Sequence, residues 1–398
     1  MSATDQSSIC AALDRAVEVA GKERSQNRVL AFQVLTLRDN PEHALPELRS
    51  LLEVLELTPA LEGFAHGQST LGLSGQVSYV YLVQWLLARA QQVGSQETVE
   101  DLGRYVRAET LSVSEVLAVD GLCVSQTVAF GDYELVPWSS LPLTDAKWHA
   151  GARGMANFDF PSAAVVQRQE VARAHLRPWE NYELRSLEPM IDVLRCTAAA
   201  AGVGFRLLHY WVEPPAWAPW AVQRMDFGID RRSPPPSQTV DAAIVPTAQD
   251  AVARFTSLEE SDTVRFRLPL ERLNRSYLAR HSPVDAAIDL GIALESLFAP
   301  AKLSEGISFA VRTRAARFLG GSIATRNETS RALKDAYDLR SRAIHAGRFD
   351  ADDTKKWRDH LRVQEALSAS QSLVATAVLK MIREGEPDWD EFDLGPAS

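Results

Sequence analysis

The chain has 398 residues, which is long enough for two or three domains with apolar cores of their own. Its 46% hydrophobic and 24% charged residues are ordinary for a globular protein, and no run approaches the roughly eighteen apolar residues of a membrane span. The net charge of −10 argues against a nucleic-acid partner for the chain as a whole, but the charge is unevenly spread. Residues 1–267 carry −10, residues 268–384 carry +5 and residues 385–398 carry −5, so we expect any polyanion to bind the basic segment.

The N-terminus, MSATDQSSICAALDRAVE, lacks the basic start and the apolar stretch of a signal peptide, which predicts a cytoplasmic protein. Cys10, Cys123 and Cys196 lie far apart without a C-x-x-C pair, so we expect buried thiols rather than disulfides or zinc ligands. The carboxylates and histidines show no metal-ligand spacing either. We therefore expect neither a metal nor a cofactor.

Residues 1–112 are predicted to form a helical N-terminal region. Apolar residues recur at helical spacing in ICAALDRAVEVA, in ALPELRSLLEVLEL and in SYVYLVQWLLARAQQV, and Gly94 closes the last of these. The segment ETVEDLGRYVRAETL is a further predicted helix. No phosphate-binding glycine loop or Walker motif names a ligand for this region or for the one that follows.

Residues 113–267 are predicted to form a mixed α/β region with antiparallel strands. The segment SEVLAVDGLCVSQTVAFGDYELVPW is rich in strand-forming residues and is broken by Asp-Gly and Gly-Asp turns. LEPMIDVLRCTAAAA is a predicted helix, and GFRLLHYWVEP and AVQRMDFGID are predicted strands that face each other across PPAWAPW. Tryptophans 138, 148, 211, 217 and 220 could form a stacking platform for bases, but packing in cores and turns is the favoured interpretation.

Residues 268–384 are predicted to be wholly helical, followed by an acidic tail at 385–398. Five helical segments, from PLERLNRSYLARH to a long last helix over 352–383, are joined by short loops, which is typical of an up-and-down bundle. Several of them end at prolines or glycines. The predicted fold is therefore α+β and mainly α, with a mixed helix and strand N-terminal region before a C-terminal helical bundle.

Within this bundle, Arg340 and His345 fit the pattern R-x(4–6)-H. With 35 arginines and 8 histidines, about two such pairs are expected by chance, and others do occur, among them Arg168 with His175 and Arg275 with His281. Spacing alone therefore cannot choose among such pairs, and the surrounding residues must decide.

The segment YDLRSRAIHAG, from Tyr337 to Gly347, resembles the catalytic helix of the Apea-like branch of the HEPN superfamily, whose motif is approximately Y-x-x-R-S-x-x-x-H-G. DAAIDLGIALESLF resembles the family's helix with an acidic residue in an LE-x-L setting, here Glu295. ISFAVRTRAARFLG resembles the following helix, with an R-x-A-R-like core at 314–317. The three segments occur in the family's order over about 80 residues. Ala346 is a departure, because many members have glycine directly after the histidine.

The resemblance implies a metal-independent endoribonuclease that works as a homodimer, with Arg340 and His345 as the catalytic pair. These two residues lie about 140° apart around one helix, so two copies related by a twofold axis would close a composite site. The reaction is attack by a ribose 2′-OH on the adjacent phosphodiester. His345 suits general acid or base work near neutral pH, and Arg340 would hold the phosphate oxygens as charge develops.

Supporting roles fall to Ser341, Tyr337 and Glu295. Each has a structural alternative: packing for Tyr337, an ion pair with Arg340 or Arg314 for Glu295, and, for His345, favourable charge at a helix C-terminus. Three arginines are candidates for RNA binding: Arg342, Arg314 and Arg317. For Arg314 and Arg317 the structural alternative is a solvent-exposed helix face.

Proteins that resemble this arrangement act in abortive infection and antiphage defence, or as toxins. Residues 1–267 would then sense a phage-derived trigger or restrain the nuclease, and a cognate antitoxin is a possible partner. In HEPN proteins that a partner nucleotidyltransferase modifies, a tyrosine lies two places after the histidine. This chain has Gly347 there, so regulation by such a nucleotidyltransferase is not supported. The alternative function is a non-catalytic HEPN module that binds RNA or dimerises as a scaffold. No membrane partner is expected.

Overall fold

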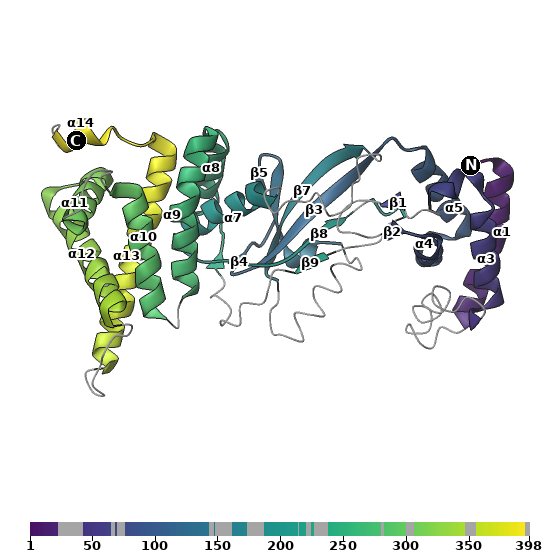
Figure 1. The fold of residues 1–398 in the computed structure, drawn as a ribbon, viewed down its shortest axis with the longest axis horizontal. Coiled ribbons are helices and arrows are strands. Elements are labelled where there is room, and N and C mark those ends of the chain that lie inside the picture. The colour runs from purple at the N-terminus through teal and green to yellow at the C-terminus, as the bar shows by residue number, and fades with distance from the viewer. Residues whose placement is uncertain are drawn as a thin grey trace.

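The computed structural model describes residues 1–22, 43–64, 68–69, 76–142, 147, 161–172, 187–213, 215–219, 224–226, 238–279, 282–299, 306–346 and 356–394. The fold is α+β and mainly α, as the sequence predicts. Figure 1 shows helices of the N-terminal region at one end, a β-sheet in the middle and a helical bundle at the other end. No helix in the described ranges has the length and apolar character needed to cross a membrane.

The described residues of the N-terminal region form four α-helices, a 3₁₀ helix and an antiparallel pair of short strands. Their bounds are α1 Ala3–Lys22, α3 Pro46–Glu56, η2 Pro59–Phe64, β1 Gln68–Ser69, β2 Gln76–Val77, α4 Tyr79–Val93 and α5 Ser95–Arg107. Helix α1 packs on α3, α4 and α5. The apolar spacing that predicts α3 also gives its buried face, since Leu48, Leu51 and Leu55 all point into the core.

The central sheet has six antiparallel strands in the order β5-β6-β7-β3-β8-β9. Their bounds are β3 Thr110–Asp120, β5 Val128–Phe130, β6 Tyr133–Pro137, β7 Ala163–Ala172, β8 Arg206–Glu213 and β9 Arg224–Asp226. Strands β8 and β9 pair with each other as predicted, with Tyr210 opposite Met225. A short parallel pair joins β4 (Leu122–Cys123) to β10 (Gln238–Thr239), and η3 (Trp138–Ser140) follows β6.

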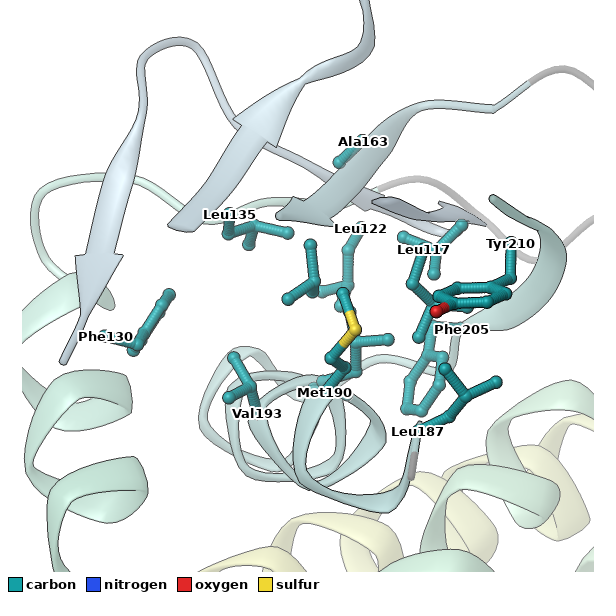
Figure 2. Close-up of a cluster of buried hydrophobic side chains, with 14 of the residues drawn as sticks. Leu117, Leu122, Phe130, Leu135, Ala163, Leu187, Met190, Val193, Phe205 and Tyr210 are labelled. Atoms are coloured by element: carbon teal, nitrogen blue, oxygen red, sulfur yellow. The ribbon is translucent and has the colours of Figure 1, made fainter. Parts of the chain in front are cut away.

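Alternating side chains along the strands belong to two separate apolar clusters, one on each face of the sheet. Leu117 and Tyr210 face helix α7 (Glu188–Ala201) and pack with its Met190, as Figure 2 shows. The opposite face holds a smaller cluster around Trp211, which is 1% exposed and lies edge-to-face against Trp138 with ring centroids 6.1 Å apart. This alternation follows from the two-residue period of a strand.

The tryptophans that the structure describes pack rather than form an open stacking surface. Trp211 and Trp138 contact each other, and the Arg104 guanidinium lies 5.2 Å from the ring centroid of Trp217. Trp148 and Trp220 lie outside the described residues. The packing interpretation is therefore confirmed for Trp138 and Trp211.

The C-terminal bundle starts earlier than the predicted border at residues 267 and 268. Its helices are α8 Val245–Thr256, α9 Glu260–Leu278, α10 Pro283–Phe298, α11 Ile307–Leu319, α12 Ile323–Ala346, α13 Lys356–Glu384 and α14 Trp389–Leu394. Helix α9 runs through the expected border with Pro269 in its interior. A proline is more often found in the first turn of a helix, which is why the sequence suggested a start there. Burial of Phe266 and Leu270 on either side of Pro269 favours the longer helix.

Helices α9, α10, α12 and α13 pack against one another, and α11 closes the bundle on α12. The acidic tail is also structured in part, because α14 lies beside α11 (Figure 1). A single cluster of buried apolar side chains runs from α1 through the sheet and α7 to α13. The helical bundle is thus joined to the sheet through α7 and α8.

Candidate functional site

Helices α10 and α12 carry the residues that the sequence singles out. Helix α10 begins at Pro283, where the Ser282 hydroxyl accepts a hydrogen bond from the Asp285 backbone N–H at 3.3 Å. Such a cap stabilises the first turn and thereby sets where the helix begins. Gly291 and Glu295 lie four residues apart on one face of α10, and Arg340 reaches this face from α12.

Arg340 and Glu295 form a two-pronged ion pair between the two helices. Arg340 Nη1 donates to Glu295 Oε1 at 2.6 Å, and Nη2 donates to Oε2 at 3.1 Å. The side chains are 23% and 28% exposed, so the pair lies at the edge of the core rather than inside it. The planar guanidinium matches a carboxylate in this geometry and would match two phosphate oxygens equally well. Glu295 therefore pairs with Arg340 and not with Arg314.

Gly291 leaves the space through which the Arg340 side chain passes. A Cβ atom at this position would lie 2.2 Å from Arg340 Cδ and 2.7 Å from its Nε. Both distances are far below van der Waals contact, so only glycine leaves Arg340 in place. Arg340 Nε is buried and has no hydrogen-bond partner among the residues that the structure describes.

Tyr337 lies one turn before Arg340 on α12 and is 7% exposed. Its ring centroid is 5.8 Å from Arg340 Cζ, and its buried hydroxyl has no hydrogen-bond partner in the described part of the chain. Burial raises the pKa of the Tyr337 phenol, the Glu295 carboxylate raises it further, and the Arg340 guanidinium lowers it. The phenol is therefore neutral at physiological pH. The expected packing role is found, but the hydroxyl is unsatisfied.

The next turn of α12 carries the remaining predicted residues. Ser341 is exposed beside Arg340. Arg342 and His345 belong to α12 through their backbone, but their side chains lie outside the described part of the structure. The structure thus brings together Tyr337, Arg340 and Glu295, with Ser341 adjacent, and leaves the contacts of His345 as a prediction.

Arg314 and Arg317 lie elsewhere, on α11 beneath α14. Arg314 Nε and Nη2 donate to the Asp393 carboxylate, with the shortest distance 2.6 Å from Nη2 to Oδ2, and Nη1 donates to the Phe298 carbonyl at 3.3 Å. Arg317 Nη1 donates to the Asp393 carbonyl at 2.9 Å. Since Arg314 is only 7% exposed, it does not form the solvated face considered from the sequence, and it is not free to bind RNA in this conformation.

The pairs Arg168 with His175 and Arg275 with His281 differ in setting from Arg340 and His345. Arg168 lies on β7 and pairs with Glu134 at 3.0 Å, and Arg275 lies on α9 with its Nε 3.6 Å from Asp289. His175 and His281 fall outside the described residues. Among the side chains that the structure describes, no group of three His, Cys, Asp or Glu residues could hold a metal ion.

Two features were missed from the sequence. Gly291 stands inside the helical pattern DAAIDLGIALESLF, and an isolated glycine in such a pattern signals a close approach by another group. The tail was interpreted by charge alone, although Trp389 and Phe392 are three residues apart, the spacing of one helix face. Both signals were present, but neither says which residue lies opposite.

Comparisons of the chain with protein-family models, with curated proteins and with solved structures find no match.

Proposed function

We propose that this protein is a metal-independent endoribonuclease of the HEPN type, an effector of abortive infection and antiphage defence or a toxin, acting in the cytoplasm. One observation carries the proposal: Arg340 is held in a fixed fork geometry by Glu295 and Gly291, on the helix that also carries His345. An arginine fixed in this way is suited to binding a phosphodiester, because little conformational freedom is lost when the phosphate arrives.

In the proposed reaction the ribose 2′-oxygen attacks the adjacent phosphorus. The O2′–P bond forms and the P–O5′ bond breaks, which leaves a 2′,3′-cyclic phosphate and a 5′-hydroxyl. His345 takes the 2′-OH proton or gives one to the leaving oxygen, and a second copy of the chain would supply the other group of a composite site. Arg340 stabilises the charge on the non-bridging oxygens. DNA, which lacks the 2′-OH, would not be cut.

A cleavage assay tests this proposal. Purified chain is incubated with total tRNA and mRNA in EDTA, beside the variants Arg340→Ala and His345→Ala. Arg331→Ala, an exposed arginine on the same helix, is the matched control. We expect the control to cut like wild type and each site variant to lose about 100-fold or more in rate. Cyclic phosphate ends should appear on the products. Equal cleavage by wild type and both site variants would refute the assignment.

The structure also offers an observation in favour of a non-catalytic RNA-binding or scaffold module. Glu295 neutralises Arg340, so a phosphate must compete with a carboxylate that is already in place. If RNA binding persists in both site variants while no condition yields cut ends, this second function is correct. The mass of the same purified chain in solution tests the proposed homodimer. Identification of the molecules that bind to it tests for a trigger or antitoxin that acts through residues 1–267.

A further inference from the structure

The C-terminal segment from Glu386 to Asp393 is a short acidic and aromatic strap across the bundle. It contains five acidic residues and no basic one. Glu386 pairs with Arg265 of α9 at the start of the strap, and Asp393 pairs with Arg314 of α11 near its end. Between these two ion pairs, Trp389 and Phe392 lie on α11 and on the end of α10.

The surface beneath the strap has the chemistry of a single-stranded RNA site. Arg314 offers Nε and Nη2 to the strap while its Nη1 stays on the Phe298 carbonyl, so the edge that faces the strap is the fork that binds phosphate oxygens. Arg317 adds a second cation one turn away. Phe298 and Phe318, with exposed fractions of 0% and 6%, lie beside these arginines. Sites for single strands combine such cations with aromatic rings on which bases stack.

The strap places matching groups on this surface. The Asp393 carboxylate occupies the arginine fork, where a phosphate would lie. The Trp389 ring meets Phe298 edge-to-face and Phe318 at a tilt, with ring centroids 5.8 Å and 6.3 Å apart, and fills space that a base could take. The Arg314 and Arg317 guanidinium carbons lie 5.0 Å and 4.9 Å from the centroids of Trp389 and Phe392.

We propose that the α11 surface formed by Arg314, Arg317, Phe298 and Phe318 is a binding site for single-stranded RNA, which the C-terminal strap occupies until RNA displaces it. The choice of RNA as the ligand rests on the proposed ribonuclease function. Helix α14 has six residues, too few to be stable without its contacts. Its ion pairs are of the kind that a polyanion competes for. Glu295 and Phe298 lie three residues apart on α10, so the site adjoins the catalytic candidates.

Binding of a strand that cannot be cut tests this inference separately from catalysis. The probe is a fluorescent 2′-O-methyl oligoribonucleotide, whose blocked 2′-oxygen prevents attack. The variants are a chain ending at Glu384, the full chain with Asp393→Asn, and the shortened chain with Arg314→Ala. We expect the shortened chain to bind about tenfold more tightly than wild type, because arginines are freed for phosphates. The full chain with Asp393→Asn should show a smaller gain in affinity. The shortened chain with Arg314→Ala should show no gain over the wild type.

Hydrogen exchange gives a second measurement on the intact chain. Saturating oligonucleotide should raise the exchange of the amides from Trp389 to Leu394, as the strap leaves α11. Unchanged affinity in the shortened chain, or a gain that survives Arg314→Ala, would overturn the inference. Binding of the free 385–398 peptide to the shortened chain, without binding of the oligonucleotide, would overturn it too and show a peptide site.

Thermal unfolding of each variant checks that it folds, since removing Trp389 exposes Phe298 and Phe318. If the shortened chain does not fold, oligonucleotide binding is measured with the full chain that carries Asp393→Asn and Glu386→Gln. This double variant keeps the aromatic contacts of the strap. Tighter binding by this double variant supports the inference, and wild-type binding overturns it. None of these outcomes depends on Arg340 or His345, so the ribonuclease proposal can fail while this one stands.

Discussion

Gly291 and Arg340 meet so closely that the glycine can be tested as a positioning residue. An alanine methyl would lie 2.2 Å from Arg340 Cδ, so we expect Gly291→Ala to push the guanidinium away from Glu295. Cleavage should fall about tenfold or more, since a small displacement of a positioned group costs much of its effect. Overpacking should cost about 1–3 kcal/mol of stability, partly offset by the higher helix propensity of alanine. Cleavage rates and urea unfolding measure the two effects.

The matched control is Gly103→Ala on α5. The nearest atoms to a methyl group there would be the flexible ends of Gln6, Arg107 and Met1, at 3.1 Å, 3.3 Å and 3.6 Å, so stability and cleavage should stay close to wild-type values. If Gly291→Ala cut RNA as fast as the wild type, the placement of Arg340 over α10 would have no role in the reaction.

The unsatisfied hydroxyl of Tyr337 gives a prediction about stability and pH. Tyr337→Phe removes a buried polar atom without a partner in the described residues, so at pH 7 the variant should be as stable as the wild type or more stable, by about 1 kcal/mol. Burial raises the pKa of Tyr337 in the folded chain. The folded chain therefore disfavours the phenolate, so ionisation of Tyr337 costs no stability below the unfolded tyrosine pKa of about 10 and lowers stability as pH rises above it.

Urea unfolding between pH 8 and pH 11 measures this slope. The wild type should lose stability above pH 10 more steeply than Tyr337→Phe does. Tyr81→Phe is the control, because Tyr81 is 39% exposed, and its pH profile should match that of the wild type. Identical slopes for all three chains would contradict a shifted Tyr337 pKa.

The candidate site shows how far single residues can be predicted. The LE-x-L setting and the Y-x-x-R-S motif place Glu295, Tyr337 and Arg340 on two helices, and these three do meet. The sequence does not show whether Glu295 pairs with Arg340 or with Arg314. The answer depends on how α10 crosses α11 and α12, and no local sequence pattern contains that information. The same holds for Gly291, whose importance comes from the side chain opposite it.

Helix α9 gives a prediction about where the bundle begins. Since α9 is one helix from Glu260, its first half should belong to the bundle core, and Phe266→Ala should destabilise the chain by about 3–5 kcal/mol. Val264→Ala, two residues away and 57% exposed, should cost less than about 0.5 kcal/mol. Chemical unfolding of both variants measures this. A Phe266→Ala chain as stable as the control would restore the border at residue 268.

Helices and strands with a strong apolar period were predicted well, whereas their ends and the short segments were not. The pattern of α3 and α7 and the pairing of β8 with β9 follow from local spacing. Strand β3 begins at Thr110 and not near Val113 because it continues to pair with β7, with Thr110 opposite Ala172. Helix α14 was missed since its six residues become a helix only against α11, and burial of a partner surface is not visible in its own sequence.

The parts of the molecule are joined by a cluster of charges between α7 and α9. Asp192, with a side chain 4% exposed, accepts from Arg195 at 2.7 Å and from Arg267 Nε and Nη2 at 3.0 Å and 2.7 Å. Arg195 also pairs with Glu188 at 2.7 Å. Helix α7 covers the sheet and α9 belongs to the bundle, so this cluster lies where the two parts meet. Sequence charge counts could not show it, because Arg267 is 75 residues from Asp192 along the chain.

We therefore expect Asp192→Ala to weaken both the fold and the coupling between its parts. Breaking a buried pair costs about 3–5 kcal/mol, since Arg195 and Arg267 keep their charge but lose a partner. We expect calorimetry of the wild type to show one transition for the bundle and the sheet, and that of Asp192→Ala to show two transitions, the first at a lower temperature. The control is Asp250→Ala on α8, whose pair with Arg254 spans 3.6 Å with both side chains at least half exposed. That variant should stay within about 0.5 kcal/mol of wild type. A single, unshifted transition in Asp192→Ala would mean that apolar packing of α7 and α8 on the bundle joins the two parts without help from the charges.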